Sequence, residues 1–414
     1  MIMGNLKTVQ ISEWTKLKAE ELKRKYNIFQ LSSPDLDVIN KIEDKIIIRQ
    51  LSNGIEIESN SYVGVVKLKD FQIIISPKIS NLNLAKMIAI AYNLKSIEIQ
   101  DKFSQLAVTD ASISDIISLI FLKEAEKVYY EGLRKRYQEK EEAIASCRGK
   151  INFNKLAKNS SSSVTLPCRY QELTVDIEEN QIILAALKLL LSNTNNRKLK
   201  KKLNILFSKI KDEVSLKPLS KELLSKALNN SDRLNNNYKN LFKLVELLLS
   251  KEDFNLLGGQ NRDFPGFLLD MNLLFERFLE KYFKKKLAPD IKVKAQNSLE
   301  NKFKSANLSY NLIPDYQFFE AGKLVKIADA KYKNYQLKKV SPADLYQLTA
   351  YALANKEKID KIYLFYPSSR MESKTFSLNN LAREIEVEII VQGLKIEKLL
   401  DEMETKNFNL NIFN

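Results

Sequence analysis

The chain of 414 residues contains no histidine, and it has only two cysteines, ten glycines and one tryptophan. Without histidine there can be no histidine-based triad, histidine general base or histidine-ligated metal, so protease, lipase and most zinc chemistries are excluded. Cys147 and Cys168 are too few for a four-cysteine zinc site or for a disulfide framework. We therefore expect plain thiols in a reducing, cytoplasmic compartment.

The scarce glycines form no nucleotide-binding loop. Gly149 and Gly322 each precede a lysine, but Ile151 and Leu324 stand where a phosphate loop has serine or threonine. No G-x-G-x-x-G occurs either, so we expect no nucleotide hydrolysis by this chain alone. No apolar run approaches the roughly 18 residues that suggest a membrane span, and the first residues lack the apolar stretch of a signal peptide. These features predict no membrane partner.

Positive charge and apolar side chains are abundant. Lysine and arginine number 66 against 51 acids, giving a formal net charge of +15, and 44% of the residues are hydrophobic. Such a chain can bury cores, and its length predicts two or three domains. The excess of basic over acidic residues indicates a polyanionic partner.

Residue patterns divide the chain into three predicted domains with a multidomain α+β fold. Residues 1–82 form a mostly-β module, in which residues 45–51 and 55–58, and residues 62–68 and 71–76, read as strands around tight turns. Residues 83–254 form a helical region, with apolar residues at helical spacing over 112–133, 180–192, 203–210 and 238–249. Residues 255–414 form a compact α/β domain.

The predicted C-terminal domain has an α-β-β-β-α-β core, which one more strand follows. A long helix covers residues 267–285, strands cover 291–293, 309–319 and 324–333, a second helix covers 342–355, and strands cover 361–366 and 384–391. Ser341 precedes Pro342, and proline is favoured in the first turn of a helix.

Two acids and a lysine stand out on the predicted strands of this domain. Asp315 and Asp329 flank a turn at Gly322, and mirrored pairing places Asp315 opposite residue 327 or 328, with Asp329 as a near or diagonal neighbour. Such neighbours lie on the order of 5–8 Å apart, close enough to share one cation. Lys331 is two residues beyond Asp329 and therefore projects from the same face.

Phosphodiester hydrolysis is the chemistry that suits this group. Mg²⁺ takes oxygen ligands, often one or two carboxylates, and a nearby lysine can orient the attacking water. In so lysine-rich a chain an acid two residues before a lysine also arises by chance, as Glu43 and Lys45 illustrate. Pro314 before Asp315, the two apolar strands and the surrounding element order favour the catalytic interpretation.

These motifs resemble a known family. Pro314-Asp315 with Asp329-Ala330-Lys331 resembles the PD-(D/E)xK nuclease motif, and more of the chain resembles the McrC family, the nuclease subunits of McrBC modification-dependent restriction systems that serve antiphage defence. The other similar segments are residues 73–79, 148–153, 168–180 and 267–278, and the pair Gln347 and Tyr351, which resembles a Q-x-x-x-Y extension.

The resemblance implies a restriction-endonuclease-like C-terminal domain and roles for individual residues. Asp315, Asp329 and Lys331 would be catalytic, and Asp315, Asp329 and Glu276 would bind Mg²⁺. Gln347 and Tyr351 would contact DNA. From the residues alone, Glu276 could equally be a solvated charge on a helix. Gln347 and Tyr351 could equally be a pair that packs their helix on the sheet.

The implied function is that of a Mg²⁺-dependent DNA endonuclease subunit acting on double-stranded DNA with modified cytosine. Its partner would be a GTP-hydrolysing AAA+ ring of McrB type, whose GTPase the first 250 residues would stimulate on docking. The 14 lysines and five acids between residues 281 and 339 suit a DNA backbone. Two alternatives stay open, a non-catalytic DNA-binding activator of the ring and a stand-alone repair nuclease of the same superfamily.

Overall fold

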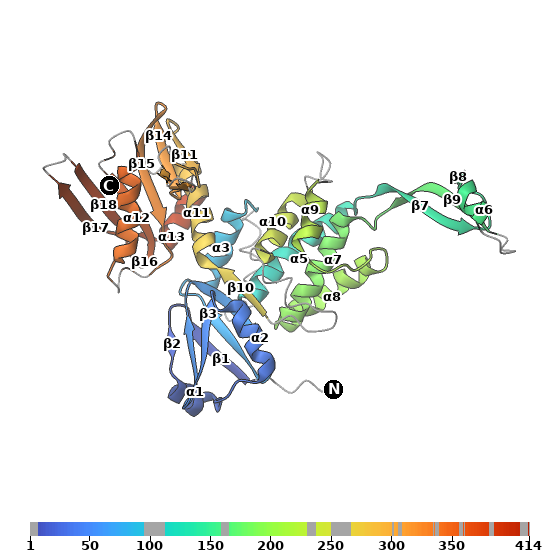
Figure 1. The fold of residues 1–414 in the computed structure, drawn as a ribbon, viewed down its shortest axis with the longest axis horizontal. Coiled ribbons are helices and arrows are strands. Elements are labelled where there is room, and N and C mark those ends of the chain that lie inside the picture. The colour runs from blue at the N-terminus through green and yellow to red at the C-terminus, as the bar shows by residue number, and fades with distance from the viewer. Residues whose placement is uncertain are drawn as a thin grey trace. The chain divides into compact units, whose positions relative to one another are not determined.

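The computed structural model describes residues 7–94, 112–158, 165–229, 237–249, 266–299, 302–304, 309–333, 335, 339–355, 359, 361–380, 385–405 and 413. The chain forms two compact units. The first joins Met1–Ile113 to Leu268–Asn414, and the second is Ser114–Phe267. Figure 1 gives the arrangement of elements within each unit. The predicted boundary near residue 254 lies outside the described residues, and the division into three domains stays a prediction.

Over residues 7–94, together with strand β10, the first unit contains two small sheets and three helices. One sheet has the order β1-β6-β5-β10 and the other β2-β4-β3. Both predicted hairpins are confirmed, since β3 pairs antiparallel with β4 and β5 with β6. The elements are β1 (Lys7–Ser12), β2 (Lys16–Leu17), α1 (Ala19–Tyr26), α2 (Ser33–Ile42), β3 (Ile46–Leu51), β4 (Gly54–Ser59), β5 (Tyr62–Lys67), β6 (Phe71–Ser76) and α3 (Asn81–Ala91).

The predicted long helix from residue 267 begins later than expected. Residues Gly266–Asp270 form strand β10, which extends the first sheet beside β5, and only then does helix α11 (Met271–Lys286) begin. Phe267 and Leu269 are buried while their neighbours are not, which is the alternation of a strand. Asp270 caps the helix by accepting hydrogen bonds from the backbone N–H of Asn272 (3.0 Å) and Leu273 (3.5 Å).

A six-stranded mixed sheet forms the second part of this unit, in the order β11-β14-β15-β16-β18-β17. The pairs β11–β14, β14–β15 and β17–β18 are antiparallel, and β15–β16 and β16–β18 are parallel. The strands are β11 (Ile291–Ala295), β14 (Tyr316–Glu320), β15 (Lys323–Ala330), β16 (Lys361–Ser368), β17 (Glu372–Asn380) and β18 (Ile385–Lys395). Strand β17 has no counterpart in the predicted order.

The single strand predicted over residues 309–319 is two strands in the structure. Ser309–Asn311 is β13, which within the described part of the chain pairs only with β12 (Lys302–Lys304), whereas β14 belongs to the six-stranded sheet. The break contains Pro314, whose nitrogen cannot donate to a sheet ladder.

Helices cover both faces of this sheet. On one face Phe283 of α11 makes edge-on ring contacts with Tyr316 (5.1 Å) and Phe318 (5.3 Å). On the other, Leu348 of α12 (Pro342–Leu353) packs in one cluster with Ile327 of β15 and other residues. Because strand residues alternate between faces, residues 327, 329 and 331 point toward the α12 side. Helix α13 (Ile396–Glu404) follows the last strand.

The second unit contains the helices predicted for the middle region and, in addition, a three-stranded sheet. Its order is β7-β9-β8, and in Figure 1 β7 and β9 form an arm that extends from the helices of this unit. Its elements are α5 (Ile113–Glu131), β7 (Arg136–Ile144), β8 (Lys150–Ile151), α6 (Phe153–Lys158), β9 (Leu166–Thr174), α7 (Glu178–Asn193), α8 (Arg197–Lys211), α9 (Lys221–Asn229) and α10 (Lys239–Leu248). No helix in the described part of the chain has the length and apolar character needed to cross a membrane.

Candidate active site

Asp315 and Asp329 lie side by side at the ends of neighbouring strands. Asp315 directly precedes β14, and Asp329 is the next-to-last residue of β15. An irregularity after Phe318 shifts the register of the hairpin, so that Tyr316 pairs with Ala328. Continued by one residue, this register sets Asp315 opposite Asp329 itself. The sequence alone suggested residue 327 or 328, because mirrored pairing contains no bulge.

Hydrogen bonds lock the two carboxylates together. The backbone N–H of Asp315 donates to Oδ1 of Asp329 (3.2 Å), and that of Ala330 donates to Oδ2 of Asp315 (2.8 Å). Both side chains are buried, with 8% of Asp315 and 1% of Asp329 exposed. Each strand therefore holds the carboxylate of the other in place.

Gln296 also hydrogen-bonds to Asp315, and the sequence analysis did not identify it. Its side-chain Nε2 donates to Oδ1 of Asp315 (2.7 Å), and its backbone N–H donates to the Asp315 carbonyl (3.0 Å). Gln296 follows β11, whose Ala295 pairs with Tyr316, so its place opposite Asp315 comes from the strand register. An isolated glutamine beyond a short strand carries no signal of this kind in the sequence.

Lys331 joins the pair through Asp329. Its Nζ lies 2.6 Å from Oδ2 of Asp329, and its backbone N–H donates to the Phe365 carbonyl (2.9 Å). Burial favours the neutral amine, but Asp329, together with Asp315 and Asp344, outweighs it, and the pKa of Lys331 is raised overall. The ammonium group therefore stays charged beside the two acids.

Glu276 of α11 is a partly buried neighbour of these charges. Burial, followed by the charge of Asp315, raises the pKa of Glu276 to about 8. Burial and the charge of Asp329 likewise raise the pKa of Asp315 to about 7. In the described residues, however, no three acidic or cysteine side chains are arranged to hold a metal together. The structure brings Asp315, Asp329 and Lys331 together, with Glu276 beside them.

Gln347 and Tyr351 lie one turn apart on α12 and bond to each other. Nε2 of Gln347 donates to the Tyr351 hydroxyl (2.7 Å), which donates to the carbonyl of Ile313 (3.1 Å). Tyr351 is buried, with 3% exposed, and burial raises its pKa, whereas Gln347 is exposed. Tyr351 thus holds the segment that leads into Asp315, and a DNA contact by either side chain stays a prediction.

The arrangement suits one hard cation. Mg²⁺ commonly takes one or two protein carboxylates and keeps several water ligands. Asp315 and Asp329 supply two buried carboxylates whose mutual repulsion a cation would relieve, which fits the raised pKa of Asp315. The donor set, all oxygen and without histidine or cysteine, favours Mg²⁺ over zinc or copper.

Comparison with known proteins agrees with the resemblance in the sequence. Residues 57–367 match the family described as McrBC 5-methylcytosine restriction system component, and this chain belongs to that family. No curated protein matches the chain.

Among solved structures, one similar chain comes from a half-complex of Thermococcus gammatolerans McrB AAA+ hexamers with bound McrC. It is 19% identical, the match covers 95% of this chain and 98% of that one, and the TM-score is 0.60. Another, from the McrBC complex of the same organism, is 21% identical with a TM-score of 0.46, over 68% of this chain and 88% of that one. The first likeness is one of fold over nearly the whole chain.

Proposed function

We propose that this chain is the Mg²⁺-dependent DNA endonuclease subunit of a GTP-dependent restriction complex directed at modified cytosine. The observation that carries the proposal is the interlocked Asp315–Asp329 pair with Lys331 at the ends of two adjacent strands. The order α11, β11, β14, β15, α12, β16 around it supports assignment of a PD-(D/E)xK core.

Asp315 and Asp329 would hold the metal, and Glu276 would act as an auxiliary acid. A bound Mg²⁺ supplies an activated water and neutralises charge that develops on the phosphate. The protein's own contribution is to keep the two carboxylates fixed. The Ala330 N–H and Gln296 hold Asp315, and the Asp315 N–H holds Asp329. Such fixed ligands require little reorganisation during the reaction.

Lys331 would orient the attacking water and stabilise negative charge on the phosphate. Its raised pKa keeps it protonated, so it would act as a hydrogen-bond donor rather than as a general base. The ion pair with Asp329 holds its Nζ at the edge of the acid pair.

The partner we propose is a GTP-hydrolysing AAA+ ring of McrB type, to which residues 1–254 would dock. The supporting observations are the family membership and a similar fold bound to McrB hexamers in the solved complex. Arg134 and Arg136 pair within the second unit with Glu179 and Glu178. Exposed Tyr137 and Phe153 on the arm suit a protein contact better.

The test is cleavage of cytosine-modified plasmid by the chain with its ring protein, GTP and Mg²⁺. Asp329→Asn keeps the side-chain volume and removes the charge, so cleavage should fall by at least about 10³-fold while GTPase stimulation remains. Asp344→Asn is the matched control, because Asp344 is also buried and pairs with a lysine, Lys333, at 2.8 Å.

The outcomes separate the alternatives. Full activity of Asp329→Asn would place the chemistry elsewhere. A wild-type protein that stimulates the ring without cutting would be the non-catalytic activator, and cleavage without ring or GTP would identify the stand-alone nuclease.

A further inference from the structure

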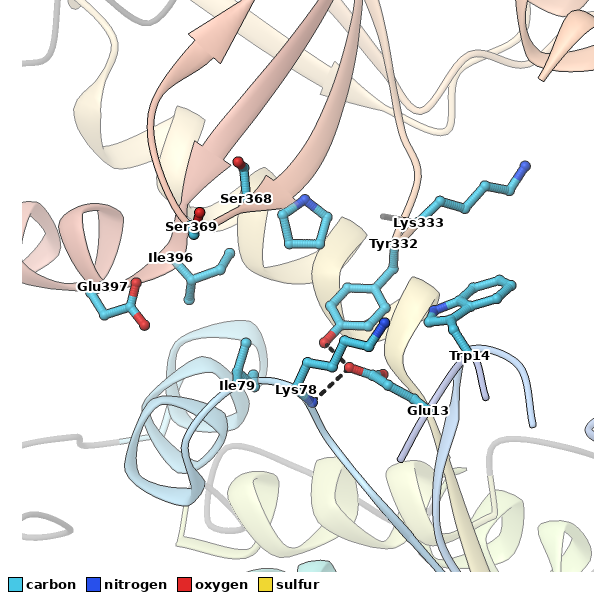
Figure 2. Close-up of a pocket in the computed structure, with 11 residues that line it drawn as sticks. Glu13, Trp14, Lys78, Ile79, Tyr332, Lys333, Ser368, Ser369, Ile396 and Glu397 are labelled. Atoms are coloured by element: carbon cyan, nitrogen blue, oxygen red, sulfur yellow. Dashed lines mark hydrogen bonds between the residues drawn. The ribbon is translucent and has the colours of Figure 1, made fainter. Parts of the chain in front are cut away.

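A buried tyrosine next to Lys331 is bonded to the first strand region of the chain. Tyr332 is 3% exposed, and its hydroxyl donates to Oε1 of Glu13 (2.9 Å), as Figure 2 shows. Glu13 follows β1 and is fully buried. The two residues are 319 positions apart in sequence, so only the fold brings them together.

Glu13 is itself held rigidly. The same Oε1 accepts the backbone N–H of Lys78 (2.7 Å), and the Glu13 N–H donates to the carbonyl of Ser76 (3.0 Å). Its second oxygen, Oε2, is buried without a hydrogen-bond partner among the described residues. An incompletely satisfied buried carboxyl is costly, and packing alone would be served better by an apolar side chain.

Tyr332 also contacts the helix that carries Glu276. Its backbone N–H donates to Oδ1 of Asn272 (3.2 Å), and its ring lies edge-on to Phe275 at 5.9 Å. Asn272 in turn donates to the hydroxyl of Ser61 (2.7 Å), at the start of the β5 region. Tyr332, the residue that follows Lys331, therefore links Glu13 to helix α11 and, through Asn272, to Ser61.

Packing alone does not fix the Tyr332 ring on all sides. A pocket of about 260 Å³ lies beside it, lined among others by Glu13, Trp14, Lys78 and Ser368 (Figure 2). Without the hydroxyl bond, the ring would lose its link to Glu13, and the backbone of residues 331 and 332 would lose one anchor. The bond to Glu13 therefore restrains the ring where it lines the pocket.

We propose that Glu13 is a positioning residue for the cleavage reaction, acting through Tyr332 to hold Lys331 at the Asp315–Asp329 pair. The inference rests on the proposed function for the role of Lys331. Small displacements of a catalytic group are enough to slow a reaction substantially, so one lost anchor should reduce turnover without weakening DNA binding. It also gives the N-terminal strands a part in the active site.

The test compares single-residue variants of the full chain assembled with the ring protein. Tyr332→Phe removes one oxygen and should lower kcat for plasmid cleavage about tenfold, with KM for DNA and GTPase stimulation unchanged. Glu13→Leu should do the same. Glu13→Gln retains an oxygen that can accept both hydrogen bonds and should stay within about threefold of wild type.

Tyr282→Phe is the matched control, since Tyr282 is equally buried on α11 and its hydroxyl donates to another carboxylate, Glu402. It should cleave like wild type. Hydrogen exchange in the peptide that contains Lys331 should increase in Tyr332→Phe and not in Tyr282→Phe, which tests the anchor without relying on cleavage. Wild-type kcat in Tyr332→Phe, or a Glu13→Gln as slow as Glu13→Leu, would overturn the inference. An inactive wild type would instead count against the proposed function.

Discussion

Two sheets of this protein use charge in opposite ways. In the six-stranded sheet, Asp315 and Asp329 are buried and meet a single lysine, Lys331. In the three-stranded sheet of the second unit, the charges are many and exposed, and they pair across the strands β7 and β9, as between Arg169 and Glu139 at 3.1 Å. Buried charges are costly and need a reason, whereas exposed pairs contribute little and are screened by salt. The contrast explains why we assign chemistry to the first sheet and contact surface to the second.

After the two acids themselves, the largest effect should come from the lysine of the buried group. Lys331→Ala removes the ammonium that lies 2.6 Å from Asp329, and cleavage should fall by at least about 100-fold. The unfolding midpoint should fall as well, because Asp329 is left buried without its ion-pair partner. Rates of plasmid cleavage and a thermal melt on the same samples would check both. An active Lys331→Ala protein would remove the lysine from the mechanism.

The buried acid Glu13 should also make the free energy of unfolding depend on pH. Burial raises the pKa of Glu13 to about 7, although hydrogen bonds from Lys78 and Tyr332 oppose the shift. The folded state then holds a proton that the unfolded state has lost, so the free energy of unfolding should fall as pH rises from about 4.5 to about 7. The contribution is on the order of 2–3 kcal/mol.

Glu13→Gln has no proton to lose and should flatten this part of the pH profile. Denaturant unfolding at a series of pH values measures the difference between the two proteins. Parallel profiles would show that Glu13 titrates normally in the folded state.

Glu276 should have a smaller effect than Lys331. Glu276→Gln removes a carboxyl group that can ionise near Asp315 and Lys331 when a cation binds, and the Mg²⁺ concentration for half-maximal cleavage should rise about tenfold. Glu280→Gln, one turn further along α11, is the control, because Glu280 pairs with Lys284 instead. An unchanged Mg²⁺ requirement would make Glu276 a helix charge without a role in the site.

The smallest effect is expected for a substitution in the exposed three-stranded sheet. Glu172→Gln weakens the pairing with Lys140 and Arg148, yet the unfolding midpoint should move by less than about 2 °C. Plasmid cleavage by the assembled complex should be unchanged if DNA is cut in the other unit. Differential scanning calorimetry together with a cleavage assay would check both expectations. A large fall in the unfolding midpoint would contradict the contrast between the two sheets.

The sequence predicted the acids, the lysine and the elements that carry them, because apolar strands around a glycine turn are strong local signals. It did not predict that Asp315 would meet Asp329 in direct register, since that depends on the irregularity after Phe318. Nor did it reveal Gln296 or the link between Glu13 and Tyr332, which arise from strand pairing and from contacts distant in sequence.

Strands were also missed where their residues do not look apolar. Strand β7 has the sequence RYQEKEEAI and is almost entirely exposed, so it lacks the alternation by which strands are found. The sequence of strand β10 predicts the start of a helix instead, because a short apolar run before a helix has no distinct period of its own.

The central claim is that Asp315 and Asp329 form one cation site. Titration of the purified chain with Mn²⁺, which accepts the same oxygen ligands as Mg²⁺ and can be followed by electron paramagnetic resonance, tests it directly. We predict one site in the wild-type protein that Mg²⁺ displaces, and loss of that site in both Asp315→Asn and Asp329→Asn but not in Asp344→Asn. Unchanged Mn²⁺ binding in either of the first two variants would contradict the account.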